Sequence, residues 1–132
     1  MRVTLDTNVL IAAFIARGTC ADLLEHLVRH HTPAASPFIL GEFREKLAGK
    51  FKMPEAEVDE AAVLLRTRLE ITEPEPLAEP VCRDPDDDAV LAAARGSACL
   101  VTGDNDLLVL RRFEGLPILR PSEFWAFEAK TA

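Results

Sequence analysis

Val3-Thr4-Leu5-Asp6-Thr7-Asn8 is a short apolar strand pattern that runs directly into an aspartate, and the same pattern recurs in Cys99-Leu100-Val101-Thr102-Gly103-Asp104-Asn105-Asp106. In an open parallel sheet, side chains at the carboxyl ends of neighbouring strands converge on one crevice. We therefore expect Asp6 and Asp104 to share a site. Two ionised carboxylates about 5 Å apart repel by roughly 3 kcal/mol at an effective dielectric near 20, so such a site calls for a cation. Hard oxygen ligands favour Mg²⁺ or Mn²⁺ over zinc.

The remaining periodic segments alternate between strand and helix. Strands are predicted at 2–5, 32–36, 98–101 and 117–119, with a brief strand or edge segment at 77–82. Helices are predicted at 8–16, 19–30, 37–49 and 54–69, from the Asp84–Asp88 run to Arg95, at 107–110, and from Pro121 onward. This order predicts an α/β fold in which a parallel sheet lies between helical layers.

Size and composition indicate a single globular domain over residues 1–132. No apolar run approaches the roughly 20 residues of a membrane span, and no signal-peptide pattern precedes the first strand, so we expect a cytoplasmic protein without a membrane partner. The three cysteines lack the Cys-x-x-Cys spacing of a zinc ribbon. The net charge of −7 argues against a surface that holds nucleic acid by bulk electrostatics, although it does not exclude a local basic edge.

Four features occur together: the strand-Asp-x-Asn opening, a lone glutamate at 42, aspartates at a later helix start, and the ending Thr102-Gly103-Asp104-Asn105-Asp106-Leu107-Leu108. This combination spans nearly the whole chain and resembles the PIN domain. Within that superfamily the details look most like the toxins of bacterial toxin-antitoxin systems, relatives of the VapC ribonucleases. The resemblance implies a three-layer α/β/α sandwich and an Mg²⁺- or Mn²⁺-dependent endoribonuclease that acts on RNA and is inhibited by a protein antitoxin. It also implies a possible homodimer, because family members often pair through helices.

The resemblance assigns roles residue by residue. Four acidic residues match the family's catalytic metal ligands: Asp6, Glu42, an aspartate at 87 or 88, and Asp104. Asp87 is preferred because its spacing to Leu91 fits the toxin-like subgroup, whereas Asp88 fits the VapC-like pattern. Asp106 matches a further acidic position that binds metal through water. Supporting positions that orient the metal ligands are Asn8, Thr102 and Asp88.

Independently of any family, such a carboxylate set can hold one or two divalent cations, which would polarise a phosphodiester and generate hydroxide from bound water. In-line hydrolysis of a phosphodiester is therefore the predicted reaction, and the resemblance implies that the phosphodiester belongs to RNA. Three other functions remain open: a HAD-like phosphatase, a receiver-type phosphotransfer domain, and a catalytically silent PIN scaffold. The first two also place aspartates after strands, but position 8 is asparagine and no strand-end lysine is evident. Metal-dependent cleavage of RNA would separate all three from the nuclease.

Each candidate also has an ordinary structural interpretation. Asp6 and the Asp84–Asp88 run could serve only as helix caps, and Glu42 could be a solvated helix residue. His26 and His30, four residues apart, can face the same way, but without further ligands helix-end charge complementation is preferred to metal binding. The basic residues around α-helical segments 37–69 could guide RNA phosphates, although separated basic residues are more often solvated. Trp125 and its aromatic neighbours favour core packing or a partner surface over base stacking.

Overall fold

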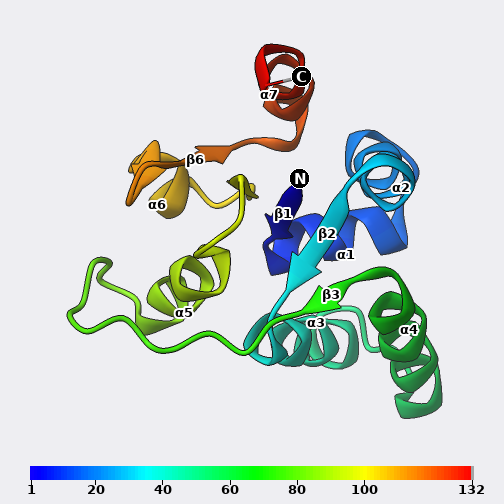
Figure 1. Cartoon of the computed structure of the whole chain (residues 1–132). Coiled ribbons are helices and arrows are strands. Elements are labelled where there is room, and N and C mark those ends of the chain that lie inside the picture. Colours follow the sequence, from blue (N-terminus) through cyan, green and yellow to red (C-terminus); the bar gives the residue numbers. More distant parts are fainter. Residues whose placement is uncertain (132) are drawn as a thin grey trace.

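The computed structural model describes residues 1–131, and Ala132, the last residue of the predicted domain, lies outside the described residues. Strands and helices alternate through most of the chain (Figure 1). Their order is β1 (Arg2–Leu5), α1 (Thr7–Ile15), α2 (Thr19–His30), β2 (Thr32–Ala35), α3 (Pro37–Gly49), α4 (Glu55–Arg68), β3 (Glu70–Ile71), α5 (Pro85–Ala94), β4 (Cys99–Val101), α6 (Asn105–Leu108), β5 (Arg112–Phe113), β6 (Leu116–Leu119), the 3₁₀ helix η1 (Pro121–Glu123) and α7 (Phe124–Thr131).

The six strands form one sheet in the order β3-β2-β1-β4-β6-β5. The ladders from β3 through β6 are parallel, and only the edge strand β5 pairs antiparallel with β6. Strands β2 and β3 extend the sheet on one side of β1, and β4 then pairs with β1 on its other side. The strand order therefore reverses between β1 and β4, where ligands of open α/β sheets bind beyond the carboxyl ends. Leu5 pairs with Val101 in this ladder, which aligns the residues that follow both strands.

Helices cover both faces of the sheet. Along β1, Arg2 and Thr4 point to the face of α5, because the Thr4 and Ser97 hydroxyl oxygens lie 2.7 Å apart and Arg2 Nη2 donates to the Arg95 carbonyl at 3.1 Å. Since side chains alternate along a strand, Val3 and Leu5 point to the opposite face. Both are fully buried in the hydrophobic core. The predicted parallel α/β/α architecture is thus confirmed, with one antiparallel edge strand added.

One predicted strand is wrong. Residues 77–82 form no strand, and the strand beside β2 is instead Glu70–Ile71, immediately after α4. Ala35 pairs with Ile71, and Thr72 N–H continues this connection by donating to the Ala35 carbonyl at 2.9 Å. The segment that follows contains Pro74, Pro76 and Pro80. Because proline lacks the N–H that a strand ladder needs, this segment runs as an irregular connection to α5.

Smaller differences concern the ends of elements. Helix α1 begins at Thr7 and α6 at Asn105, earlier than expected, because Asp6 and Asp104 cap them through their side chains. The two-residue strand β5 was not predicted, since a strand this short has no periodicity to detect. No single described helix is long and apolar enough to cross a membrane, and α1 with α2 reach that length only jointly, across a bend of 102°.

Candidate active site at the carboxyl edge of the sheet

Asp6 is held at the end of β1 by both of its carboxylate oxygens. Its Oδ1 accepts from the backbone N–H of Thr7 at 2.7 Å, which caps α1, and its Oδ2 accepts from Thr102 Oγ1 at 2.7 Å and from Asn8 Nδ2 at 3.1 Å. The backbone N–H of Asp6 also donates to the Val101 carbonyl at 3.0 Å. Asp6 is therefore a cap, as its ordinary interpretation predicts, and at the same time the link between the two strand-end loops.

Thr102 and Asn8 place Asp104 beside Asp6. The Thr102 hydroxyl, which donates to Asp6, accepts from the backbone N–H of Asp104 at 3.0 Å. Asn8 Oδ1 accepts from the backbone N–H of Gly103 at 2.7 Å, so its amide bridges the same two loops. A Cβ atom at Gly103 would lie 3.2 Å from Asn8 Oδ1, which explains the value of glycine in this close approach. Asn8 and Thr102, which were predicted to orient the metal ligands, therefore both donate hydrogen bonds to the Asp6 carboxylate.

Glu42 reaches this edge from α3. That helix begins at Pro37 and is capped by Ser36, whose hydroxyl accepts from the Ile39 N–H at 3.2 Å. Thr7 Oγ1 donates to Glu42 Oε1 at 2.9 Å, connecting the carboxylate to the first residue of α1. Sequence reasoning missed Thr7 as part of the site. The sequence did contain an indication of this role, because Thr7 carries a hydroxyl and lies between the candidate site residues Asp6 and Asn8.

The aspartates around the start of α5 divide into different roles. Asp84 caps the helix by accepting from the Asp86 N–H at 2.9 Å. Asp88 accepts from the backbone N–H groups of Val81 and Cys82, at 3.2 and 2.8 Å, and so anchors the proline-rich connection. Asp87 is buried, and Asp104 is among the groups that raise its pKa. The geometry therefore favours Asp87 over Asp88 as a member of the acidic cluster.

The four carboxyl groups of the cluster, Asp6, Glu42, Asp87 and Asp104, influence one another electrostatically. Burial and the charge of Asp104 raise the pKa of Asp87 to about 7. Burial also raises the pKa of Asp6, where the Thr102 hydrogen bond opposes the effect and Asp104 adds to it. Burial raises the pKa of Glu42 as well, with a contribution from the charge of Asp6. Desolvation and like charges disfavour the ionised forms.

This arrangement fits a hard divalent cation. All of its charged donors are carboxylate oxygens, the ligands that Mg²⁺ and Mn²⁺ prefer. No described lysine or arginine forms an ion pair with any of the four carboxylates. A divalent cation would offset both the repulsion and the desolvation that raise these pKa values.

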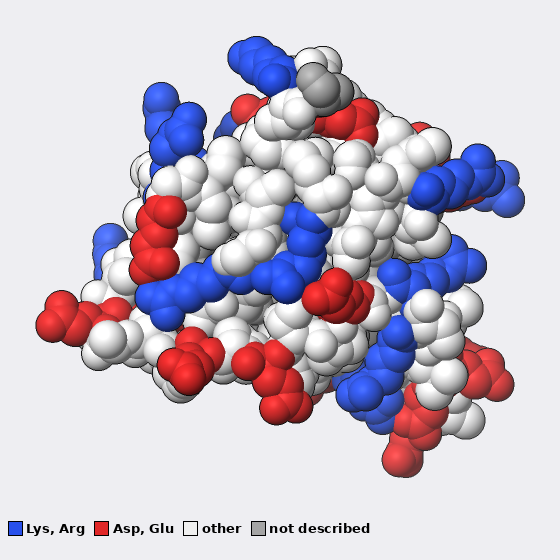
Figure 2. Space-filling view, in the orientation of Figure 1, with Lys and Arg blue, Asp and Glu red and all other residues white. Residues whose placement is uncertain are grey.

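Two other predicted features are less closely connected to the cluster, although the backbone N–H of Asp106 donates to Asp104 Oδ1 at 2.9 Å. Asp106 is exposed, and its side chain lines a groove of about 950 Å³ with Arg111 and Arg120. Its charge is not among the causes that raise the pKa of Asp6, Glu42 or Asp87. The proposed basic edge is also interrupted, because Arg44 is paired with Asp59. Figure 2 shows basic and acidic side chains interspersed over one face, without an unbroken basic surface.

Comparisons with known proteins agree with this fold. A family model described as "PIN domain" matches residues 2–106. A chain in the crystal structure of VapBC2 from Rickettsia felis, bound to a DNA fragment from their promoter, superposes with a TM-score of 0.64 and 20% identity, over 89% of this chain and 97% of that chain. Identity this low shows a shared fold and nothing more. No curated protein matches the sequence. The chain, whose motifs and fold both match, therefore belongs to the PIN-domain family.

Proposed function

We propose that this protein is a metal-dependent endoribonuclease that hydrolyses RNA phosphodiesters. The observation that supports the proposal is the chain of hydrogen bonds that joins Asp6 to the loop of Asp104 through Thr102 and joins Glu42 to the residue after Asp6, at the point where the strand order reverses. The charge of Asp104 also raises the pKa of Asp87. Membership in the PIN-domain family supports nuclease chemistry. It also removes the HAD-like phosphatase and the receiver domain as alternatives.

The carboxylates would hold Mg²⁺ or Mn²⁺ as ligands. When bound, the metal would polarise the phosphodiester and lower the pKa of a coordinated water. Thr102 orients the Asp6 carboxylate, and Thr7 orients that of Glu42, through hydrogen bonds of 2.7 and 2.9 Å. Hydrogen bonds of this kind fix the orientation of the carboxylate oxygens that would bind the metal. Asp106 remains a candidate for a contact through water, with less support than the other four.

We further propose that the protein is the toxin of a toxin-antitoxin pair and binds a protein antitoxin. The sequence motifs and the fold similarity to a chain of the VapBC2 complex support this assignment. The homodimer remains an expectation from family resemblance. A catalytically silent PIN scaffold is the surviving alternative, and the intact acidic positions argue against it.

The test is cleavage of a mixed RNA substrate by the purified chain with Mg²⁺, with Mn²⁺, and with EDTA. Activity is expected only with metal and should fall by about 100-fold or more in Asp104→Asn and in Asp87→Asn, because each loses a charged ligand. Asparagine can still cap α6 at position 104, so the Asp104→Asn fold should be retained. Circular dichroism of each variant checks this. Full activity in either variant, or no activity in the wild type with any metal, would refute the assignment.

Asp88→Asn is the matched control for Asp87→Asn. An asparagine oxygen at position 88 can still accept from the Val81 and Cys82 N–H groups, so the connection before α5 should stay in place. Cleavage by Asp88→Asn is expected to remain within about threefold of wild type, which lies inside the usual range for surface changes. Loss of activity in Asp88→Asn but not in Asp87→Asn would assign the ligand to Asp88 instead.

A further inference from the structure

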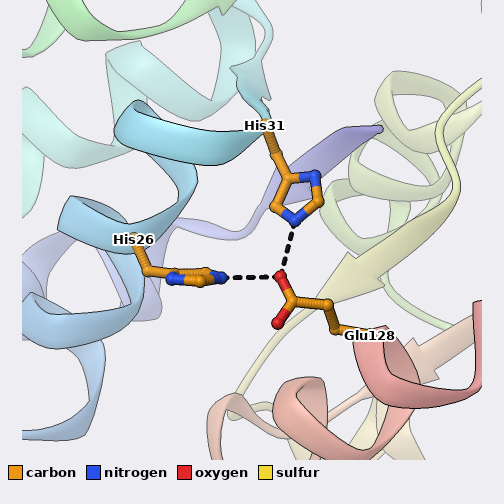
Figure 3. Close-up of side chains that lie close together, drawn as sticks. All are labelled: His26, His31 and Glu128. Carbon is orange, nitrogen blue, oxygen red and sulfur yellow. Dashed lines mark hydrogen bonds and ion pairs between the residues drawn. The ribbon is translucent and has the colours of Figure 1, made fainter. Parts of the chain in front are cut away.

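A second cluster of ionisable side chains lies away from the acidic site, between α2 and α7. His26 belongs to α2, His31 follows its last residue, and Glu128 belongs to α7. Both histidine Nε2 atoms lie 2.6 Å from the same oxygen, Glu128 Oε2. Figure 3 shows the two imidazoles pointing toward this one carboxylate from different directions. Segments about a hundred residues apart in sequence thus converge on a single point.

The cluster is partly shielded from water. The side chains of His26, His31 and Glu128 are 25, 15 and 25% exposed. The rings of Trp125 and Phe124 lie beside it, with centroids 4.7 and 6.3 Å from that of His26. An apolar surround of this kind strengthens the interaction between a charged ligand and a cation. The opening that remains leaves an entry path for an ion.

The donor set is that of a transition-metal site. Two imidazole nitrogens and one carboxylate oxygen form the ligand set of many zinc sites that leave a fourth position open. The three ligand atoms lie within 4.8 Å of one another. Tetrahedral coordination with bonds of about 2.0–2.1 Å needs ligand atoms roughly 3.3 Å apart. The two Nε2 atoms, which lie within 4.8 Å of each other, therefore have to approach by up to about 1.5 Å through rotation of the imidazoles. Glu128 Oε2 has to withdraw from each nitrogen by less than about 1 Å. A glutamate side chain on a helix surface can make this adjustment through its rotatable bonds.

We propose that His26, His31 and Glu128 form a binding site for one Zn²⁺ ion, distinct from the acidic site at the sheet edge. The mixed nitrogen and oxygen donors select a borderline ion such as Zn²⁺, whereas the carboxylate-only cluster selects Mg²⁺ or Mn²⁺. A Zn²⁺ ion here joins α7 to α2 and to the start of β2. It stabilises the folded chain without taking part in phosphodiester hydrolysis.

The test is titration of the full chain with Zn²⁺, measured by isothermal calorimetry after EDTA treatment and exchange into excess Mg²⁺. The excess Mg²⁺ competes for the proposed acidic site, and the Asp104→Asn control below detects any Zn²⁺ that binds there. One Zn²⁺ per chain is expected, together with a higher melting temperature. His31→Gln and Glu128→Gln should each weaken this binding by at least about 100-fold, because removing a direct ligand costs more than removing an outer contact.

Two controls isolate the cluster. His30→Gln changes a histidine on the same helix whose ring lies 4.8 Å from that of His26 but which has no bond to Glu128, and it should bind Zn²⁺ as the wild type does. Asp104→Asn should also retain Zn²⁺ binding, which distinguishes this proposal from the proposed nuclease site. Failure of RNA cleavage would leave the Zn²⁺ result unaffected, and the reverse holds as well.

Nuclear magnetic resonance of the histidine side chains provides a measurement that needs no variant. Zn²⁺ should shift the Nε2 resonances of His26 and His31 and leave those of His30 unchanged. Equal affinity in the wild type and His31→Gln, or histidine shifts confined to His30, would overturn the proposal. So would the absence of Zn²⁺ binding to the wild type, which would identify the cluster as a hydrogen-bonded ion pair only.

Discussion

The two clusters of ionisable residues balance their charges in opposite ways. At the sheet edge, burial and neighbouring carboxylates raise the pKa values of Asp6, Glu42 and Asp87. Between α2 and α7, hydrogen bonds from His26 and His31 lower the pKa of Glu128. The first cluster contains only carboxyl groups, whereas the second contains one carboxylate together with the two histidines that bond to it.

This difference separates sites that need a ligand from sites that can hold together without one. The acidic cluster lowers the stability of the metal-free fold at neutral pH, because like charges are buried together. The Glu128 cluster adds stability at the same pH, because each donor has an acceptor. The proposed Mg²⁺ or Mn²⁺ would therefore offset an electrostatic cost in the first region, whereas the proposed Zn²⁺ would add to contacts that already form without it in the second.

The largest expected effect tests the cost of the acidic cluster. In EDTA at pH 8, the free energy of unfolding of Asp87→Asn should exceed that of the wild type by about 2–3 kcal/mol, because a rise in pKa from 3.8 to about 7 sets the upper limit and solvent screening lowers it. The folded wild type retains a proton that the unfolded chain releases between about pH 4 and 7. The stability of the wild type relative to the variant therefore falls as the pH rises through this window and levels off above it.

Urea unfolding at several pH values between 4 and 8 measures this difference. Asp88→Asn serves as the control and should change the stability at pH 8 less than Asp87→Asn does, because an asparagine oxygen can still accept from the Val81 and Cys82 N–H groups. Addition of Mg²⁺ should narrow the gap by stabilising the wild type. A difference between wild type and Asp87→Asn that stays constant across the pH range would contradict the repulsion argument.

A smaller effect is expected from the hydroxyl that connects the two strand ends. Thr102→Val removes the donor to Asp6 Oδ2 and the acceptor for the Asp104 N–H while keeping the shape of the side chain. RNA cleavage should fall by about 10–100-fold, the usual cost of losing a contact that orients a metal ligand. Single-turnover rates with saturating metal provide the measurement. Thr102→Ser should restore most of the rate, and equal rates for the valine and serine variants would show that the hydroxyl does not orient Asp6.

The smallest effect concerns the second cluster and has the opposite dependence on pH. In EDTA at pH 7, Glu128→Gln should lower the free energy of unfolding by about 1 kcal/mol, because partly exposed ion pairs contribute little to stability. Since hydrogen bonds lower the pKa of Glu128 below its ordinary 4.5, this stability is present above that value and is lost as the pH falls through the lowered pKa. Thermal unfolding from pH 2 to 7 follows the difference. Glu25→Gln, which breaks a more exposed ion pair with Arg29, should lower the free energy of unfolding by less. A larger loss in Glu25→Gln than in Glu128→Gln would contradict the stabilising role of the Glu128 carboxylate that both histidines share.

The sheet could be predicted wherever periodicity was strong and local. The strand before Asp6 and the strand before Asp104 were both expected, because short apolar runs between turn signals are typical of buried parallel strands. The strand at 70–71 was missed because it continues the apolar pattern of α4 without interruption. The expected strand at 77–82 failed because proline spacing, rather than hydropathy, decides that segment.

The site shows the same limit. From the sequence we expected only that aspartates after parallel strands would share one edge of the sheet, and the pairing of β1 with β4 in the structure places the loops of Asp6 and Asp104 side by side. The choice between Asp87 and Asp88 depends on the rotation of α5 about its axis, and adjacent residues on a helix point about 100° apart. The histidine cluster was not predicted. Helical spacing pairs His26 with His30, whereas the cluster in the structure consists of His26, His31 and Glu128, which is distant in sequence.

By itself, the sequence determined an α/β chain of the PIN type with acidic residues at two strand ends, because strand and helix periodicities and the residues that follow them are local properties. Only the tertiary structure showed that Asp87 is buried while Asp88 accepts from backbone N–H groups, that Thr7 donates to Glu42, and that His26 and His31 meet Glu128. These contacts depend on how helices rotate and pack against one sheet, which is set by the burial of many residues together and cannot be derived from the spacing of a few.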